Sequence, residues 1–212
     1  MIIIAVVQQK GGAGKSTLTR GLAVLALQSG LRSAIVDTDE QATSLMWAHE
    51  RQAAGIPAPA VVALGEQRHA DLYEHLRRRG ADVLFVDTPP HARPAISLAV
   101  THATGVLIPV QPSPDDLKAM GATLDIVRPT GKPAGIVLNR AKPRTAGFRA
   151  AVEALERSGI PLCPAVLQDR MEHQYASAAG LTATESAPAS KAADELAAVW
   201  EWVKQHVCRE TV

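Results

Sequence analysis

The sequence predicts an α/β fold in which a doubly wound, mostly parallel sheet carries helices on both faces. Short apolar segments alternate with helical patterns, a glycine-rich loop follows the first apolar segment, and acidic residues end two later ones. Strands that alternate with helices form right-handed βαβ units, which build a parallel sheet covered on both sides. The expected strands lie at residues 2–7, 33–37, 60–64, 82–87, 105–110, 134–139 and 162–167.

The glycine-rich loop at residues 10–17 reads KGGAGKST and precedes a helical pattern. Its glycines let successive backbone N–H groups point at phosphate oxygens, and the following helix adds its positive N-terminal end. In such a loop Lys15 reaches the β- and γ-phosphates, and Ser16 offers its hydroxyl to Mg²⁺. We therefore predict a site for ATP or ADP with Mg²⁺. Its loop residues are Gly11, Gly12, Ala13, Gly14, Lys15, Ser16 and Thr17.

Carboxylates stand at the ends of two expected strands. Asp37 and Asp39 are two positions apart, so both side chains point to the same side as the strand ends. Asp87 ends the strand at 82–87, and open α/β sheets bind ligands at the carboxyl ends of their strands. Asp87 is therefore expected to hold Mg²⁺. Asp39 and Glu40 also fit the start of a helix, where acids are favourable.

The loop carries a second lysine, Lys10, and so resembles the deviant Walker A loop of the ParA/MinD family of dimerising ATPases. Residues 37–41 are similar to the A′ motif of that family, with Glu40 in place of the usual proline. The resemblance implies that Lys10 reaches the nucleotide of a partner subunit, that Asp39 orients or activates the attacking water, and that Asp37 supports the Mg²⁺ shell. The expected catalytic residues are Lys10, Lys15 and Asp39, and the expected metal residues are Ser16, Asp37 and Asp87.

Weaker similarities extend the resemblance over the whole chain. Asn139 and Arg140 resemble a family pair in which the asparagine reads the adenine ring, although an asparagine at a strand end is also a common turn residue. Residues 111–115 resemble the segment that leads into a helix at the dimer interface, and their prolines also suit a helix start. The similarity is strongest at residues 1–45 and 82–90.

Residues 128–149 carry six cations and no acid. Clustered cations neutralise DNA phosphates without reading bases. The candidate DNA-binding residues are Arg140, Lys142, Arg144 and Arg149, and a solvated charged face is the alternative. The arginines at 77–79 are a rival patch that also suits a helix C-terminus before Gly80. No helix-turn-helix pattern precedes the loop, so operator-specific repression is not expected.

Length and composition suit a single P-loop ATPase domain at residues 1–212, with 47% apolar residues for its core. The net charge of +1 requires any basic surface to be local. Cys163 and Cys208 form no metal or disulfide pattern, which fits a reducing cytosol. No leader or membrane-spanning stretch is evident, so we expect a cytoplasmic protein that is nucleoid-associated when ATP-bound. The apolar face around Trp200 is expected to pack on the sheet.

The resemblance implies a short ParA-type partition ATPase without an N-terminal DNA-reading domain. Such a protein binds Mg-ATP, closes into a homodimer and coats nonspecific DNA. It is released when a centromere-binding or cargo-adaptor protein stimulates hydrolysis, and it thereby segregates a plasmid, chromosome or other cargo. Two alternatives stay open: an ATP-dependent ligase that resembles dethiobiotin synthetase, and a MinD-like regulator at a membrane surface. We expect no stable membrane association.

Overall fold

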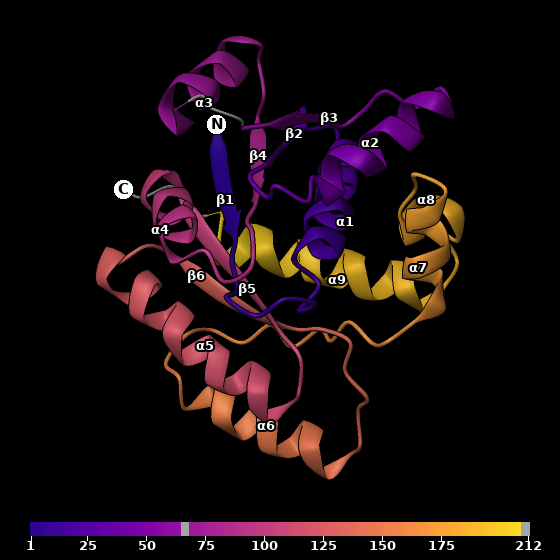
Figure 1. Ribbon diagram of the computed structural model, residues 1–212. Coiled ribbons are helices and arrows are strands. Elements are labelled where there is room, and N and C mark those ends of the chain that lie inside the picture. The colour runs from indigo at the N-terminus through magenta and orange to yellow at the C-terminus, as the bar shows by residue number, and fades with distance from the viewer. Residues whose placement is uncertain (65–67, 209–212) are drawn as a thin grey trace.

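The computed structural model describes residues 1–64 and 68–208 and contains a six-stranded parallel sheet (Figure 1). The strand order is β3-β2-β4-β1-β5-β6, and every neighbouring pair is parallel, which confirms the predicted fold class. The strands are β1 (Ile2–Val6), β2 (Ser33–Asp37), β3 (Ala60–Ala63), β4 (Val83–Asp87), β5 (Gly105–Val110) and β6 (Ala134–Leu138).

One face of the sheet is covered mainly by α1 (Lys15–Gln28) and α9 (Lys191–His206), which contact each other. Figure 1 shows α9 crossing the sheet, and its residues Leu196, Val199 and Trp200 are buried there. The predicted packing of the terminal apolar face is therefore confirmed. In the described parts of the chain, no helix is long and apolar enough to span a membrane.

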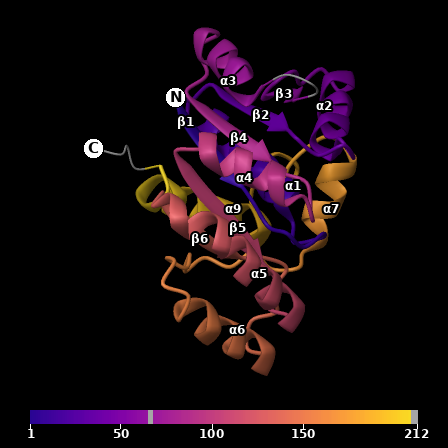
Figure 2. The ribbon, with the colours of Figure 1, turned by 60° about the vertical axis from the view of Figure 1, so that its left-hand side comes forward.

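Shorter helices border the same face. They are α2 (Thr43–Ala53), α7 (Met171–Ala178) and α8 (Ala183–Ser186). Trp47 of α2 is buried in the core on this face, and its Nε1–H donates to the Leu181 carbonyl at 3.0 Å. Arg51 of α2 forms a buried ion pair with Glu185 at 2.9 Å. These contacts hold α2 against α7 and α8, and Figure 2 shows α2 and α7 on one side of the molecule.

The opposite face is covered by α3 (His69–Arg78), α4 (Arg93–His102), α5 (Pro114–Val127) and α6 (Ala146–Glu156). The Ser113 side chain caps α5 by accepting the Asp116 N–H, and Pro114 occupies the first turn, as expected for a helix start. A short 3₁₀ turn, η1 (Arg128–Thr130), ends α5. Both ribbon views place α5 beside α6, far from α3 (Figures 1 and 2).

The sheet register brings the functional strand ends together. Val6 pairs with Asp87 between β1 and β4, and Asp37 pairs with Asp87 between β2 and β4. The chain leaves β1 for β2 on one side, while β5 lies on the other side of β1. This reversal of strand order is where open parallel sheets bind ligands. The loop after β1 and the acids after β2 and β4 therefore share one edge.

The predicted strand at residues 162–167 is wrong. This segment runs along β6 but forms only isolated bridges, at Leu162 with Ile136 and at Gln168 with Ala141. Cys163 and Leu167 donate to Ile136 and Leu138, so four residues of the segment span two residues of β6, and this slip in register prevents a continuous ladder. The N–H groups of Cys163 and Leu167 still bond to β6 carbonyls at 2.8 and 2.9 Å.

Candidate nucleotide-binding site

A cleft of about 720 Å³ opens at the carboxyl edge of the sheet. The glycine-rich loop forms one wall, while residues 168–178 form another. The sequence-predicted residues that line it are Gly11, Gly12, Gly14, Lys15, Ser16, Thr17, Asp39, Asn139 and Arg140. Asp37 and Asp87 are buried, and neither they nor Lys10 line the cleft. The structure thus gathers most of the predicted residues around one opening.

The loop conformation depends on Gly14, which precedes α1 in the left-handed region with φ of 90°. A Cβ atom at Gly14 would lie 1.8 Å from Nδ2 of Asn139, so only glycine fits. That Nδ2 donates to the Ala13 carbonyl at 2.8 Å, and the Asn139 Oδ1 accepts the Arg140 N–H at 2.9 Å. Asn139 therefore supports the loop from β6. Its role in reading adenine remains a prediction.

Lys15 lies in the cleft at the start of α1 and is only 6% exposed. Its Nζ donates to the Lys10 carbonyl at 3.4 Å. Burial lowers the pKa of Lys15, while the charges of Asp87 and Asp39 act in the opposite direction. The side chain is thus held where a buried cation can meet phosphate oxygens.

Asp87 lies beneath the loop and is fully buried. Burial raises the pKa of Asp87 to about 6, against the lowering effect of the Ser44 and Ser16 hydroxyls. The Ser44 hydroxyl donates to Oδ2 at 2.7 Å, while Oδ1 is buried and has no hydrogen-bond partner among the described residues. A carboxylate oxygen left open beside Ser16 fits Mg²⁺, a hard cation that prefers oxygen ligands.

No group of three or more histidine, cysteine or acidic residues in the described ranges could hold a metal ion by itself. Mg²⁺ commonly uses one or two carboxylates together with water and substrate phosphates. Asp87 and Ser16 are the residues that would hold it here.

Asp37 shapes the loop that leads into α2. Its Oδ1 accepts the Asp39 N–H at 3.1 Å, and its Oδ2 accepts the N–H groups of Ser44 and Leu45 at 2.9 and 3.1 Å. Burial raises the pKa of Asp37, and these backbone N–H groups oppose that effect. Both carboxylate oxygens are thus engaged by backbone, so support of the Mg²⁺ shell by Asp37 stays a prediction.

Asp39 follows in the same loop and lines the cleft. Its Oδ1 accepts the Gln41 N–H at 3.0 Å, which closes a local turn. The helix α2 begins only at Thr43, so Asp39 and Glu40 do not start it. The carboxylate of Asp39 is partly exposed toward the cleft, and its role toward the attacking water remains a prediction.

Lys10 points away from the cleft and toward α5. Its Nζ lies 2.5 Å from Oδ2 of Asp116, a residue whose side chain is fully buried. This hydrogen bond raises the pKa of Lys10. The Ser113 hydroxyl donates to the same oxygen at 2.6 Å. In the single chain, Lys10 is therefore bound to the N-terminal turn of α5.

Asp116, Arg20 and Ser44 did not stand out in the sequence as site residues. Arg20 is a buried cation between apolar positions of α1, a pattern that could have marked it. Ser113 and Asp116 are three residues apart, which is the spacing of a helix cap. This pattern does not indicate that Asp116 pairs with Lys10. The cleft wall formed by His173, Gln174, Ser177 and Ala178 was likewise unassigned.

The basic run at residues 128–149 is divided between two ends of β6. Arg128 donates to the Ser158 carbonyl at 2.5 Å, and Lys132 donates to the Val100 carbonyl at the end of α4 at 2.7 Å. These two cations have structural partners at the amino end of the strand. The four candidate DNA-binding residues follow its carboxyl end, and Arg140 among them lines the cleft.

The four DNA-binding candidates are all exposed. Arg140 lies 3.4 Å from Asp169 in an exposed ion pair and also lines the cleft. Lys142, Arg144 and Arg149 form no ion pair within the described part of the chain, and Arg149 donates to the Arg144 carbonyl at 3.3 Å. These three exposed cations follow the cleft residue Arg140 along the chain.

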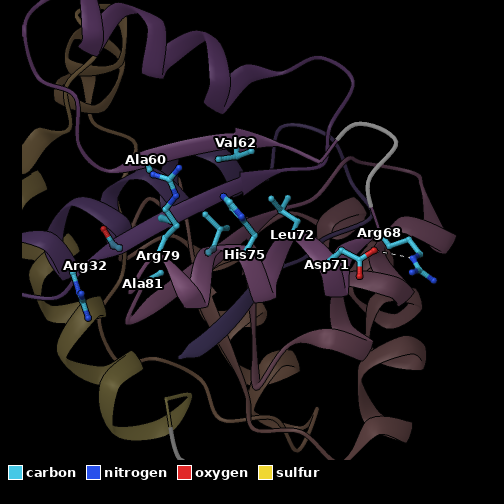
Figure 3. Close-up of a pocket in the computed structure, with 12 residues that line it drawn as sticks. Arg32, Ala60, Val62, Arg68, Asp71, Leu72, His75, Arg79 and Ala81 are labelled. Atoms are coloured by element: carbon cyan, nitrogen blue, oxygen red, sulfur yellow. Dashed lines mark hydrogen bonds and ion pairs between the residues drawn. The ribbon is translucent and has the colours of Figure 1, made fainter.

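The rival patch at residues 77–79 lies at the end of α3, as its alternative interpretation predicts. Arg77 and Arg78 both pair with Glu74, at 3.4 and 3.2 Å. Arg79 lines a separate hollow of about 900 Å³ between α3 and strands β2 and β3. Figure 3 shows Arg79 and His75 reaching from α3 toward the strand that carries Ala60. None of the residues predicted to bind nucleotide lines this hollow.

The parallel sheet, the loop at the strand-order reversal and the buried acid beneath it define a P-loop nucleotide-binding protein. The chain belongs to the CobQ/CobB/MinD/ParA nucleotide binding domain family, whose model matches residues 4–182. The ParA/MinD resemblance predicted from the sequence is thus confirmed, and relatives in this family include proteins described as ATPases.

Two relatives show the extent of the similarity. The chain is 31% identical over 202 residues to the maintenance of carboxysome distribution protein A of Halothiobacillus neapolitanus. This match covers 91% of the chain and 92% of the relative. It is 31% identical over 155 residues to the chromosome-partitioning ATPase Soj of Thermus thermophilus, which covers 59% of this chain and 62% of the relative.

Solved structures share the fold at lower identity. The cell division ATPase MinD of Pyrococcus furiosus has a TM-score of 0.76 and 22% identity, with 96% of this chain and 98% of that chain covered. An ATP complex of McdA from Cyanothece has a TM-score of 0.73 and 16% identity, and the match covers 97% of this chain and 95% of that chain.

Proposed function

We propose that residues 1–212 form a single ParA-type ATPase unit that converts ATP and water to ADP and phosphate in a Mg²⁺-dependent reaction. In the proposed cycle, ATP closes two copies into a face-to-face homodimer, and the dimer binds DNA without sequence preference. A centromere-binding or cargo-adaptor protein then stimulates a weak basal hydrolysis and releases the dimer. The protein thereby segregates or positions a plasmid, chromosome or other cargo in the cytoplasm, on the nucleoid.

One observation carries this proposal. The glycine-rich loop holds two lysines in different environments, with Lys15 buried in the cleft and Lys10 outside it, paired with Asp116. A lysine of this loop that does not reach the nucleotide site of its own chain is suited to the nucleotide of a second copy, once its bond to Asp116 is released. We propose that Lys10 acts mainly in trans in this way.

The residues within one chain have separate proposed roles. Lys15 holds the β- and γ-phosphates, and its charge offsets the negative charge that develops there during hydrolysis. Asp39 orients the attacking water from the rim of the cleft. Ser16 and Asp87 hold Mg²⁺, which neutralises phosphate charge when bound, while Asp37 fixes the loop that carries Asp39.

The proposed task rests on the relatives and on the local charge. A relative that matches nearly the whole chain is named for carboxysome distribution, and another for chromosome partitioning. Arg140 lines the cleft, and Lys142, Arg144 and Arg149 after it are exposed cations that form no ion pair in the described ranges, which suits nonspecific phosphate contact. We propose this surface for DNA and no stable membrane association.

The oligomeric state tests the proposal. We expect the Asp39→Ala variant to sediment as a dimer with Mg-ATP and as a monomer with Mg-ADP, because ATP closes the dimer and the variant cannot hydrolyse it. A monomer under both conditions would contradict the cycle. Pelleting with liposomes in ATP would instead support a membrane-surface regulator, and ATP-dependent product formation from a small carboxylic acid would support a ligase.

A further inference from the structure

Arg20 is a buried cation that lines the nucleotide cleft. It lies on α1, about one and a half turns after Lys15, and is 6% exposed. In the described parts of the chain it forms no ion pair, and its hydrogen-bond partners are two serine hydroxyls. A buried guanidinium without a direct carboxylate partner is costly to retain. An apolar side chain of similar size would fill the same space, so its charge needs an explanation.

Arg20 is connected to Asp87 through the hydroxyl of Ser44. Nε of Arg20 donates to the Ser44 hydroxyl oxygen at 3.2 Å, and the Ser44 hydroxyl donates to Oδ2 of Asp87 at 2.7 Å. Serine has one hydroxyl proton, so an oxygen that accepts from arginine turns that proton toward the carboxylate. Each of these two hydrogen bonds involves a charged group, and such bonds are stronger than bonds between neutral groups.

The geometry also fixes which oxygen of Asp87 is left open. Ser44 occupies Oδ2, while Oδ1 is buried and has no partner among the described residues. The backbone N–H of Ser44 is held by Asp37 at 2.9 Å, so the serine itself cannot move freely. The bond from Ser44 to Oδ2 therefore restrains rotation of the carboxylate.

We propose that Arg20 and Ser44 are positioning residues for the Mg²⁺ site: Arg20 orients the Ser44 hydroxyl, and Ser44 fixes Asp87 with Oδ1 directed toward the metal. This inference rests on the proposed Mg-ATP function. Outer-shell partners of metal ligands commonly change metal affinity by about 10- to 100-fold when removed.

The second partner of Arg20 provides a matched control. Nη1 donates to the Ser177 hydroxyl of α7 at 2.9 Å, through a different nitrogen from the one that reaches Ser44. Ser177→Ala removes one bond of Arg20, as Ser44→Ala does, but leaves the bond from Ser44 to Asp87 intact. A purely structural role for Arg20 would make the two substitutions equivalent.

The test measures binding of a fluorescent ADP analogue in EDTA and then during a Mg²⁺ titration. Ser44→Ala should bind the analogue in EDTA as the unmodified protein does, but should need roughly tenfold more Mg²⁺ for half of the metal-dependent gain in affinity. Arg20→Met should shift the Mg²⁺ midpoint in the same direction. Ser177→Ala can change the affinity in EDTA, because Ser177 lines the cleft, but it should keep the original Mg²⁺ midpoint, because Ser177 has no bond to Asp87. Ser44→Thr should have the midpoint of the unmodified protein, because threonine retains the hydroxyl.

Three results would overturn the inference. The Mg²⁺ midpoint could be unchanged in Ser44→Ala, or equally shifted in Ser177→Ala. Arg20→Met could also weaken binding in EDTA without moving the midpoint, which would make Arg20 a direct nucleotide contact. If the unmodified protein bound no ADP analogue, or gained nothing from Mg²⁺, the proposed function would fail as well. If the unmodified protein gained affinity from Mg²⁺ and Ser44→Ala had the same Mg²⁺ midpoint, this inference would fail while the proposed function would stand.

Discussion

Lys10 Nζ and Asp116 Oδ2 lie 2.5 Å apart and join the nucleotide loop to the first turn of α5. A second contact reinforces the junction, because Nε2 of Gln111 donates to the Gly12 carbonyl at 2.6 Å. Asp116 is fully buried, so its charge depends on Lys10 and on the Ser113 hydroxyl for compensation. Any role of Lys10 on the nucleotide of a second copy requires this pair to separate.

The two loop lysines should therefore respond differently to substitution. Lys15→Ala should weaken ATP binding by about 10- to 100-fold, because a buried charged donor to the phosphates is removed. Lys10→Ala should bind ATP but fail to complete a hydrolysing dimer. Titration with ATP and sedimentation of both variants measure the two effects. An equal loss of ATP affinity in both variants would contradict action of Lys10 in trans.

Asp39→Ala should keep ATP binding and lose turnover by about a hundredfold or more, the range typical of an acid–base group. The phosphate-binding loop does not depend on this carboxylate, whose Oδ1 accepts only the Gln41 N–H at 3.0 Å in its local turn. Phosphate release and ATP affinity measured on the same preparation separate chemistry from binding. Undiminished hydrolysis would assign the catalytic role to another residue.

The sequence predicted the fold well because its signals are local. Six of the predicted strands are present, since each is a short apolar run between turns or helices. The segment at 162–167 does not form a strand because its register against β6 slips between Cys163 and Leu167, which its apolar content could not show.

The nucleotide loop was equally predictable, because its residues are contiguous. The partners of Lys10 and Arg20 were not, since Asp116 lies 106 residues after Lys10 and Ser177 lies 157 residues after Arg20. Such contacts depend on how the helices pack on the sheet. Asp37 illustrates the same limit, because no local pattern predicted that its buried carboxylate accepts the N–H groups of Ser44 and Leu45 in α2.

The exposed cations from Arg140 to Arg149 should govern DNA binding. Combined charge removal at Arg140, Lys142 and Arg144 should weaken binding to all sequences alike. It should also flatten the dependence of log affinity on log salt by roughly 0.9 for each DNA phosphate that the variant no longer neutralises. Fluorescence anisotropy with labelled DNA at several salt concentrations measures both quantities. ATP affinity is measured in parallel, because Arg140 also lines the cleft.

A matched triple substitution at Arg77, Arg78 and Arg79 serves as the control for that experiment, since it removes the same number of charges from the end of α3. We expect it to leave the salt slope unchanged. A normal slope in the first variant, together with a reduced slope in the second, would place the DNA surface at the end of α3.

The stability of the fold should fall in mild acid through His69. Its Nδ1 lies 2.8 Å from the Tyr73 hydroxyl, and its ring stacks on His102. Burial and then the charge of His102 lower the pKa of His69 from its ordinary value of 6.5. The unfolded chain therefore binds the proton first, so stability is complete above about pH 6.5 and decreases as the pH falls below it.

Thermal unfolding between about pH 7.5 and 5.5, a range that brackets the ordinary histidine pKa, checks this sign. His69→Phe keeps a ring against His102 but cannot titrate, so its unfolding midpoint should decrease less with acidification than that of the unmodified protein. Burial also lowers the pKa of His173 and raises that of Asp87 to about 6, and these two groups add slopes of opposite sign to both proteins. Parallel curves for the two proteins would show that His69 does not contribute to the acid sensitivity.

We propose that the bound nucleotide controls DNA binding. A gel shift of random-sequence DNA with the unmodified protein tests this central claim most directly. With Mg-ATP, the DNA should be retarded at a protein concentration that leaves it free with Mg-ADP. The retardation should be the same for DNA fragments of unrelated sequence. Equal retardation with ATP and ADP, or none with either nucleotide while ATP still binds, would contradict the claim.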